Sequence, residues 1–234
     1  MKFKITFISD THTLHEQITK DLPGGDIIIH AGDTMNSGRF ESELKSFCDW
    51  YNDDSVDYDH KIFIAGNHDR MFEDEPQRAM EIVNSYDWID YLQDETIEVG
   101  NDKRTIKIYG SPWQPEFYDW AFNLPKSGPG LQMKWEAIPE DVEILITHGP
   151  PQEILDISGP PYNQGQLGCS LLRERVEVIK PKIHVFGHIH GSYGYKFING
   201  THFINASILN EQYHYKNKPL TIEWDPDTNE LEFI

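Results

Sequence analysis

The chain has 234 residues, of which 38% are hydrophobic, 12% aromatic and 25% charged. This composition excludes an intrinsically disordered chain and is sufficient for a large hydrophobic core, so we expect a single domain over residues 1–234. The 39 acidic and 20 basic residues give a formal net charge of −19. Because such a surface repels polyanions, we expect no binding to extended nucleic acid.

The two cysteines, Cys48 and Cys169, are too few for a disulfide framework and are expected as free thiols in a cytoplasmic protein. Residues 1–10 lack the uninterrupted apolar run of a secretory signal. The sequence also has no stretch approaching the roughly 20 apolar residues of a membrane span. We therefore expect an unprocessed protein that does not bind membranes.

Five short apolar runs each end in a polar cluster, and this pattern predicts strands that are buried on both faces. The runs cover residues 3–9, 27–29, 62–65, 144–147 and 183–186. Helical patterns at 39–51 and 169–179 alternate with them, which favours largely parallel sheets covered by helices. Ligands of such sheets bind beyond the carboxyl ends of the strands, where all five polar clusters fall.

Hairpin patterns accompany the parallel strands. We expect hairpins at 96–99 with 105–109, at 193–198 with 201–204 around Asn199-Gly200, and at 220–224 with 231–234. The predicted fold class is therefore α/β, with two mixed sheets packed face to face and helices outside. Residues 159–162, Gly-Pro-Pro-Tyr, are expected as a loop near the mouth of the site.

The polar clusters carry residue types that bind divalent metals. An Asp-x-His triplet such as Asp10-Thr11-His12 is expected about once by chance in a chain of this composition, whereas Gly-Asn-His-Asp at 66–69 and Gly-His-x-His at 187–190 are much rarer. Hard oxygen donors mixed with imidazoles suit Mn, Fe, Zn, Ni or Co. Seven candidate ligands suffice for two ions that share one carboxylate: Asp10, His12, Asp33, Asn67, His148, His188 and His190.

Two divalent ions about 3.5 to 4 Å apart can hold a water between them, lower its pKa and clamp a phosphoryl oxygen for in-line attack. The expected cofactor is thus a pair of divalent ions, with Mn first and Fe, Zn, Ni, Co or Mg as alternatives.

These motifs, in this order over residues 3 to about 210, resemble the calcineurin-like metallophosphoesterases. The segments 110–117, 120–125, 148–151 and 204–207 are similar to the metallophosphoesterase-domain-containing, class III phosphodiesterase branch of that superfamily. The resemblance implies a four-layer α/β/β/α sandwich. It also implies one metal on Asp10, His12 and His190, a second on Asn67, His148 and His188, and Asp33 as the bridge between them.

The same resemblance implies that His68 is a catalytic histidine near the leaving group and that Asp69 orients or tunes it. We expect Asn67, His68 and Trp113 at the substrate. Most rings of the aromatic loop 113–122 would pack in the core, with one or two stacking on a base. His30 and His184 are expected to be structural, hydrogen-bonded histidines.

The predicted activity is hydrolysis of phosphodiesters, with small cyclic nucleotides as the leading substrates. The alternatives are a phosphomonoesterase, a nuclease acting on nucleic-acid ends, or a nucleotide-binding protein with little turnover. A protein phosphatase is disfavoured because Gly32-Asp33 continues as Thr34-Met35 and departs from that subfamily's motif.

Overall fold

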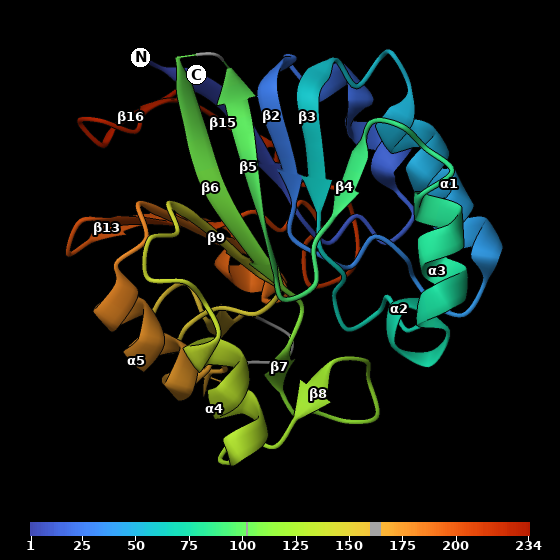
Figure 1. Ribbon diagram of the computed structural model, residues 1–234. Coiled ribbons are helices and arrows are strands. Elements are labelled where there is room, and N and C mark those ends of the chain that lie inside the picture. The colour runs from blue at the N-terminus through green and yellow to red at the C-terminus, as the bar shows by residue number, and fades with distance from the viewer. Residues whose placement is uncertain (102, 160–164) are drawn as a thin grey trace.

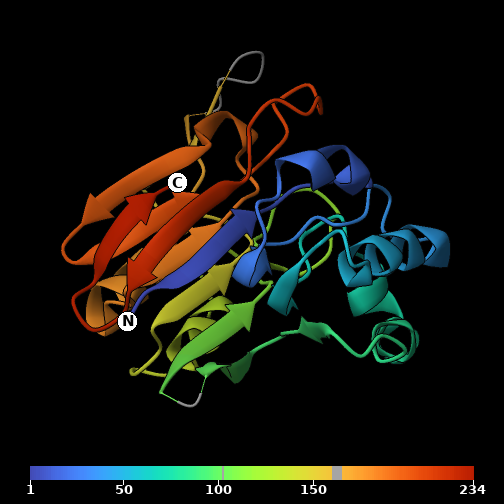
Figure 2. The same cartoon turned by 90° about the horizontal axis from the view of Figure 1, so that it is seen from above.

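The computed structural model describes residues 1–101, 103–159 and 165–234, and two six-stranded β-sheets form its centre (Figures 1 and 2). Residue 102, in the turn of the first expected hairpin, and residues 160–162 of the expected loop near the mouth of the site lie outside the described residues. No helix in the described ranges is long and apolar enough to cross a membrane.

The first sheet has the strand order β16-β15-β1-β2-β3-β4. Strands β1 to β4 are parallel, and the C-terminal hairpin of β15 and β16 adds two antiparallel strands beside β1. The strands are β1 (Phe3–Ile8), β2 (Gly25–His30), β3 (Tyr58–Phe63), β4 (Ile89–Tyr91), β15 (Leu220–Asp225) and β16 (Glu230–Phe233).

The second sheet has the order β13-β14-β12-β9-β6-β5, with a parallel centre and an antiparallel strand at each edge. Asn199 and Gly200 join β13 to β14 with φ of 51° and 91°, as the expected two-residue turn requires. The strands are β5 (Glu95–Asn101), β6 (Arg104–Ser111), β9 (Ile144–Thr147), β12 (Ile183–Phe186), β13 (Gly194–Ile198) and β14 (Thr201–Asn205).

Side-chain alternation along the strands builds the layers. Ile27 and Ile29 of β2 belong to the core between the sheets, whereas Ile28 packs in a second core against helix α1 (Glu41–Asn52). A third core joins Leu145 and Phe186 of the second sheet to helices α4 (Pro129–Glu136) and α5 (Ser170–Ile179).

Because α1 and α3 (Pro76–Val83) cover the first sheet and α4 and α5 cover the second, the molecule has four layers, α/β/β/α, as predicted (Figure 1). Several short elements have no counterpart in the sequence prediction. They are η1 (His15–Asp21), α2 (Met71–Asp74), α3, α4, β4, η2 (His190–Ser192), and the two-stranded pairs β7 (Gln114–Pro115) with β8 (Asn123–Leu124) and β10 (Ile157–Ser158) with β11 (Gly165–Gln166).

The two sheets are tied together at the end where the candidate site lies. Ser9, just after β1, forms a parallel bridge with Ser207, just after β14, and the Ile208 amide donates to the Ser9 carbonyl at 3.1 Å. The carboxyl ends of the central strands of both sheets are thereby held at one edge.

Two buried histidines have the structural role that the sequence predicts. The Gly32 amide donates to Nδ1 of His30 at 3.3 Å, so Nε2 carries the hydrogen and faces Thr11 Oγ1 at 2.9 Å. His184, within β12, is fully buried and its Nε2 contacts Thr147 Oγ1 at 2.9 Å. Burial lowers the pKa of each of these histidines to about 3.

We predict that His184→Gln reduces the acid sensitivity of the fold. Below about pH 6.5 the unfolded chain protonates His184, whereas the folded chain keeps it neutral until pH approaches its lowered pKa, so the wild type loses stability as pH falls. At about 1.4 kcal/mol per pH unit, the wild-type unfolding free energy should drop between pH 6.5 and 4.5 by roughly 2 to 3 kcal/mol more than that of the variant. Denaturant unfolding at both pH values measures this; identical pH dependence in the two proteins would contradict it.

Candidate metal centre

Loops after the parallel strands of the first sheet carry six of the predicted site residues, one of which, Asp69, follows His68 directly. Asp10 and His12 follow β1, Asp33 follows β2, and Asn67 and His68 follow β3. Asp10, His12 and Asp33 have φ of 55°, 40° and 59°, in the left-handed region that non-glycine residues rarely adopt. Such conformations cost free energy and persist where the surrounding contacts enforce them, which is typical of functional sites.

The second sheet supplies three histidines from its own strand ends. His148 follows β9 directly, His188 lies two residues beyond the end of β12, and His190 begins η2. His148 is fully buried and His190 is 8% exposed. The structure thus brings all the predicted ligands to one place, although they come from both sheets.

One group consists of Asp10, His12 and His190, whose ligand atoms all lie within 4.8 Å of one another. His190 Nε2 is 3.4 Å from Asp10 Oδ1. Asp10 is held in place by Ser207 Oγ, which donates to its Oδ2 at 2.7 Å, and by the His188 amide. Ser207 was not singled out from the sequence as a site residue, because its role depends on the bridge between the two sheets.

A second group consists of Asp33, His148 and His188, again within 4.8 Å. Asn67 belongs beside it, since His148 Nε2 lies 3.0 Å from Asn67 Oδ1 and 3.4 Å from Asp33 Oδ1. Asn67, His148 and His188, which the sequence assigns to a second metal, therefore lie together with Asp33 and offer one carboxylate, one amide oxygen and two imidazoles.

Asp33 lies between the two groups. Its Oδ1 is 3.4 Å from His148 Nε2, and its Oδ2 is 3.5 Å from His12 Nε2. Each oxygen therefore faces a histidine of a different group, which is the arrangement that a bridging carboxylate needs. The His68 amide donates to Oδ1 at 2.7 Å and fixes the orientation of the carboxylate.

Backbone carbonyls set the tautomers of two histidines. Nδ1 of His148 faces the Ala31 carbonyl at 2.9 Å, and Nδ1 of His190 faces the Asn210 carbonyl at 3.0 Å. Because a carbonyl only accepts, each Nδ1 carries a hydrogen and each Nε2 can face a metal. The sequence gives no signal for these carbonyl partners, since any residue has one.

Buried, unpaired nitrogens and nearby carboxylates in the two ligand groups favour a bound cation. Both ring nitrogens of His12 are buried without a hydrogen-bond partner within the described structure, and burial lowers the pKa of His12 to about 4. Burial would also lower the pKa of His148, but the neighbouring Asp33 and Asp10 carboxylates raise it to about 9. Unpaired buried nitrogens are costly, and a divalent ion would use them as ligands. These residues therefore fit a pair of divalent ions.

His68 lies against the metal-ligand groups. Its ligand atom lies within 4.8 Å of those of His12 and Asp33, and its ring packs edge-on to that of His12 at 4.6 Å between centroids. Nδ1 faces the Asn36 carbonyl at 2.5 Å, and the ring stacks on Trp120 with centroids 4.1 Å apart.

The expectation for Asp69 needs correction. Both of its carboxylate oxygens bind groups of neighbouring loops rather than the His68 ring: they accept hydrogen bonds from the amides of Asp33, Thr34, Met35 and Gly66 and from Thr34 Oγ1, at 2.7 to 3.2 Å. Asp69 therefore holds the loop of Asp33 against the loop of Asn67, and the partner of the His68 ring is the Asn36 carbonyl.

Trp113 is also placed differently from expectation. Its indole donates to Asp94 at 2.9 Å, Lys134 lies over its ring at 4.2 Å, and it packs edge-on against Phe122. Trp120, seven residues later in the same aromatic loop, is the tryptophan that lines the cavity beside His68. The sequence could not separate the two because both lie in one aromatic, proline-containing segment.

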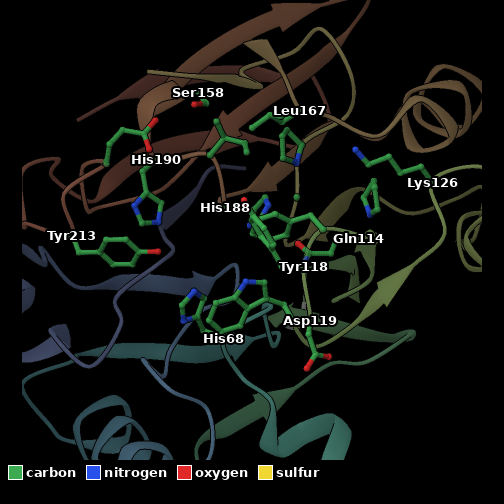
Figure 3. Close-up of a pocket in the computed structure, with 17 residues that line it drawn as sticks. His68, Gln114, Tyr118, Asp119, Lys126, Ser158, Leu167, His188, His190 and Tyr213 are labelled. Atoms are coloured by element: carbon green, nitrogen blue, oxygen red, sulfur yellow. The ribbon is translucent and has the colours of Figure 1, made fainter. Parts of the chain in front are cut away.

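A cavity of about 650 Å³ opens beside the two ligand groups (Figure 3). His68, His188 and His190 form part of its wall, so it gives direct access to the candidate metal centre. Aromatic residues 117, 118 and 120 of the loop between β7 and β8 form another part, and Tyr213 lies beside His190.

Glycines in the motifs allow the ligands to approach closely. A Cβ on Gly187 would lie 2.2 Å from Asp10 Oδ2 and 2.1 Å from Ser9 Oγ, and one on Gly66 would lie 2.3 Å from Asp33 Oδ1. Only a residue without a side chain fits at these two positions while the carboxylates stay in place. Gly187 and Gly66, which precede His188 and Asn67, are therefore required for the close approach of these candidate ligands to the carboxylates.

We predict that Gly187→Ala lowers metal affinity by about 10- to 100-fold, because the added methyl group displaces the Asp10 carboxylate. Gly149→Ala is the matched control, since its Cβ would meet its nearest neighbour at 3.9 Å, an ordinary contact. Equilibrium dialysis with metal analysis measures both, and circular dichroism verifies folding. Equal affinity in the two variants would contradict the assignment.

Comparisons with known proteins agree with this geometry. The sequence pattern of the family described as calcineurin-like phosphoesterase matches residues 3–192, and the chain belongs to that family. It is 39% identical over 237 residues to metallophosphoesterase domain-containing protein 1 of Homo sapiens, covering 92% of this chain and 69% of the relative. A UPF0046 protein of Caenorhabditis elegans is 35% identical, with 92% and 58% covered.

Two solved structures show the same fold at 14% identity. The protein TT1561 of Thermus thermophilus superimposes with a TM-score of 0.64 over 100% of this chain and 99% of that one. Phosphopantetheinyl hydrolase from Mycobacterium tuberculosis superimposes with a TM-score of 0.60 over 90% of each chain. The protein is therefore a metallophosphoesterase by family and fold, with buried His/Asp groups that can hold metal ions.

Proposed function

We propose that the protein is a phosphodiesterase that hydrolyses small nucleotide diesters, cyclic nucleotides in particular. The observation that supports this most is the cavity, which adjoins both ligand groups and has aromatic walls. Flat aromatic side chains stack on any nucleobase, and a cavity of about 650 Å³ is within the usual size range for a small-molecule site.

Hydrogen bonds fix the backbone of the aromatic wall, which is the part of the cavity lined by residues 117, 118 and 120. Asn123 Nδ2 donates to the carbonyls of Phe117 and Tyr118 at 3.1 and 3.0 Å, and Gln114 Nε2 donates to Asn123 Oδ1 at 3.1 Å. Phe117 packs edge-on against the His188 ring, with centroids 5.5 Å apart. A base that stacks on this wall would therefore place its phosphate within reach of the histidine groups.

We propose that two Mn²⁺ ions bind at this site. One ion would be held by Asp10, His12 and His190, and the other by Asn67, His148 and His188. Asp33 would bind both ions. When bound, the two ions supply an activated water and neutralise charge on the phosphoryl group. The protein residues keep the ligands oriented through the carbonyls of Ala31 and Asn210 and through the Ser207 hydroxyl.

His68 is the proposed proton donor to the leaving group. The Asn36 carbonyl fixes a hydrogen on its Nδ1, which leaves Nε2 as the nitrogen that can deliver a proton. Stacking on Trp120 holds the ring in this orientation. Such a donor matters most when the leaving group is a poorly acidic sugar hydroxyl.

We predict that His68→Ala loses about 10² to 10⁴-fold in kcat/KM on a nucleotide diester but much less on a bis-nitrophenyl diester, whose leaving group scarcely needs a proton. Asn67→Ala should affect both substrates alike, because it removes a metal ligand. Steady-state kinetics on both substrates decide this, with metal content checked in each variant. Equal losses for His68→Ala would show that His68 acts on the phosphoryl charge or on substrate position instead.

Substrate class is tested by a panel of a generic diester, a generic monoester, 2′,3′- and 3′,5′-cyclic nucleotides and a long single-stranded RNA, each with Mn²⁺ and with chelator. We expect the cyclic nucleotides to rank first, the RNA last because of the net charge of −19, and no turnover after chelation. A monoester or RNA in first place would contradict the proposal, and so would tight nucleotide binding without turnover.

A further inference from the structure

Tyr213 lies beside both the candidate metal centre and His68. Its ring centroid is 4.9 Å from that of His12, 5.1 Å from that of His190 and 6.3 Å from that of His68. It also lines the cavity. Figure 3 shows its hydroxyl pointing into the cavity, between the imidazoles of His190 and His68.

The backbone holds Tyr213 in this place at a conformational cost. Its φ of 58° is in the left-handed region, which is unfavourable for a bulky residue. The Asn210 carbonyl accepts from the Tyr213 amide at 2.9 Å and from His190 Nδ1 at 3.0 Å. The same carbonyl therefore positions a candidate metal ligand and this tyrosine together. The Asn210 side chain adds hydrogen bonds from the amides of Gln212 and His214.

A hydrogen-bond donor at this end of the cavity would add to the stabilisation of the transition state. The transition state of in-line attack on a phosphate carries negative charge on its equatorial, non-bridging oxygens, and donors placed at such oxygens can stabilise it. Among the cavity-lining residues that the structure describes, Lys126 is the one Lys or Arg. Figure 3 places it across the cavity from His190 and Tyr213. A neutral donor is therefore what the protein itself offers beside His12 and His190.

We propose that Tyr213 is a catalytic residue whose hydroxyl donates a hydrogen bond to a non-bridging oxygen of the phosphoryl group as the reaction proceeds. This rests on the proposed phosphoester hydrolysis at the same site but not on a preference for diesters, because every phosphate ester has such an oxygen. The hydroxyl keeps its proton throughout, so no covalent step is involved. His68 serves the leaving oxygen, and Tyr213 serves an oxygen that stays on phosphorus.

Tyr213→Phe tests the proposal because it removes the hydroxyl and keeps the ring packed on His12 and His190. On whichever ester the wild type hydrolyses fastest, kcat should fall about 100-fold while KM changes little. Metal content should equal that of the wild type. Tyr195→Phe is the matched control, since its hydroxyl contacts His202 Nδ1 on β14 and should be dispensable for turnover. An unchanged kcat in Tyr213→Phe would overturn the proposal. If metal content then fell only in Tyr213→Leu, which removes the ring as well, Tyr213 would have a packing role alone.

A binding measurement separates this proposal from the proposed function. Inorganic vanadate can adopt the five-coordinate geometry of phosphoryl transfer, whereas inorganic phosphate stays tetrahedral. Calorimetry on metal-loaded protein should show that Tyr213→Phe weakens vanadate binding by much more than phosphate binding, even if no diester in the panel is hydrolysed. Equal binding of vanadate by wild type and variant would overturn the role of Tyr213, whatever the substrate class proves to be.

Discussion

The structure of the site depends on one carboxylate, Asp33, that faces imidazoles from both halves of the molecule. Its two oxygens lie 3.4 and 3.5 Å from His148 of the second sheet and His12 of the first. Such contacts require the strand ends of the two sheets to be fixed relative to each other. The bridge between Ser9 and Ser207 provides that fixation, and Asp69 clamps the loops that carry Asp33 and Asn67. The packed core between the sheets then serves as the rigid support of the candidate centre.

Much of this arrangement could be predicted from the sequence because it depends on local patterns. The strands 144–147 and 183–186 and the Asn199-Gly200 hairpin agree with the structure, since apolar runs and turn residues act over a few positions. The convergence of the seven predicted ligands follows from one topological rule, that parallel strands present their carboxyl ends at one edge. Short helices such as α3 and α4 were not predicted, because eight residues give too little hydrophobic periodicity for a helix to be recognised.

The remaining differences concern long-range hydrogen bonds. Which of Trp113 and Trp120 lines the cavity depends on which indole donates a hydrogen bond to Asp94, a residue of another loop. The role of Asp69 depends on four backbone amides that the chain brings together only when folded. Asn36 and Asn210 act through their carbonyls, so their side chains give no indication. Sequence patterns identify which atoms can bind a metal, and tertiary structure decides what orients them.

The spread of the ligands along the chain has a consequence for synthesis and folding. The site takes residues from Asp10 to His190, and its tie to the second sheet reaches Ser207. A growing chain that has reached only β4 has the parallel strands of the first sheet but no histidine from the second, and Asp33 has one partner group instead of two. High-affinity metal capture at this site would therefore come late, after most of the polypeptide has been made and both sheets have paired. Bound ions would then stabilise the finished sandwich against opening. Metal uptake by a nascent chain would thus report the completion of its tertiary structure.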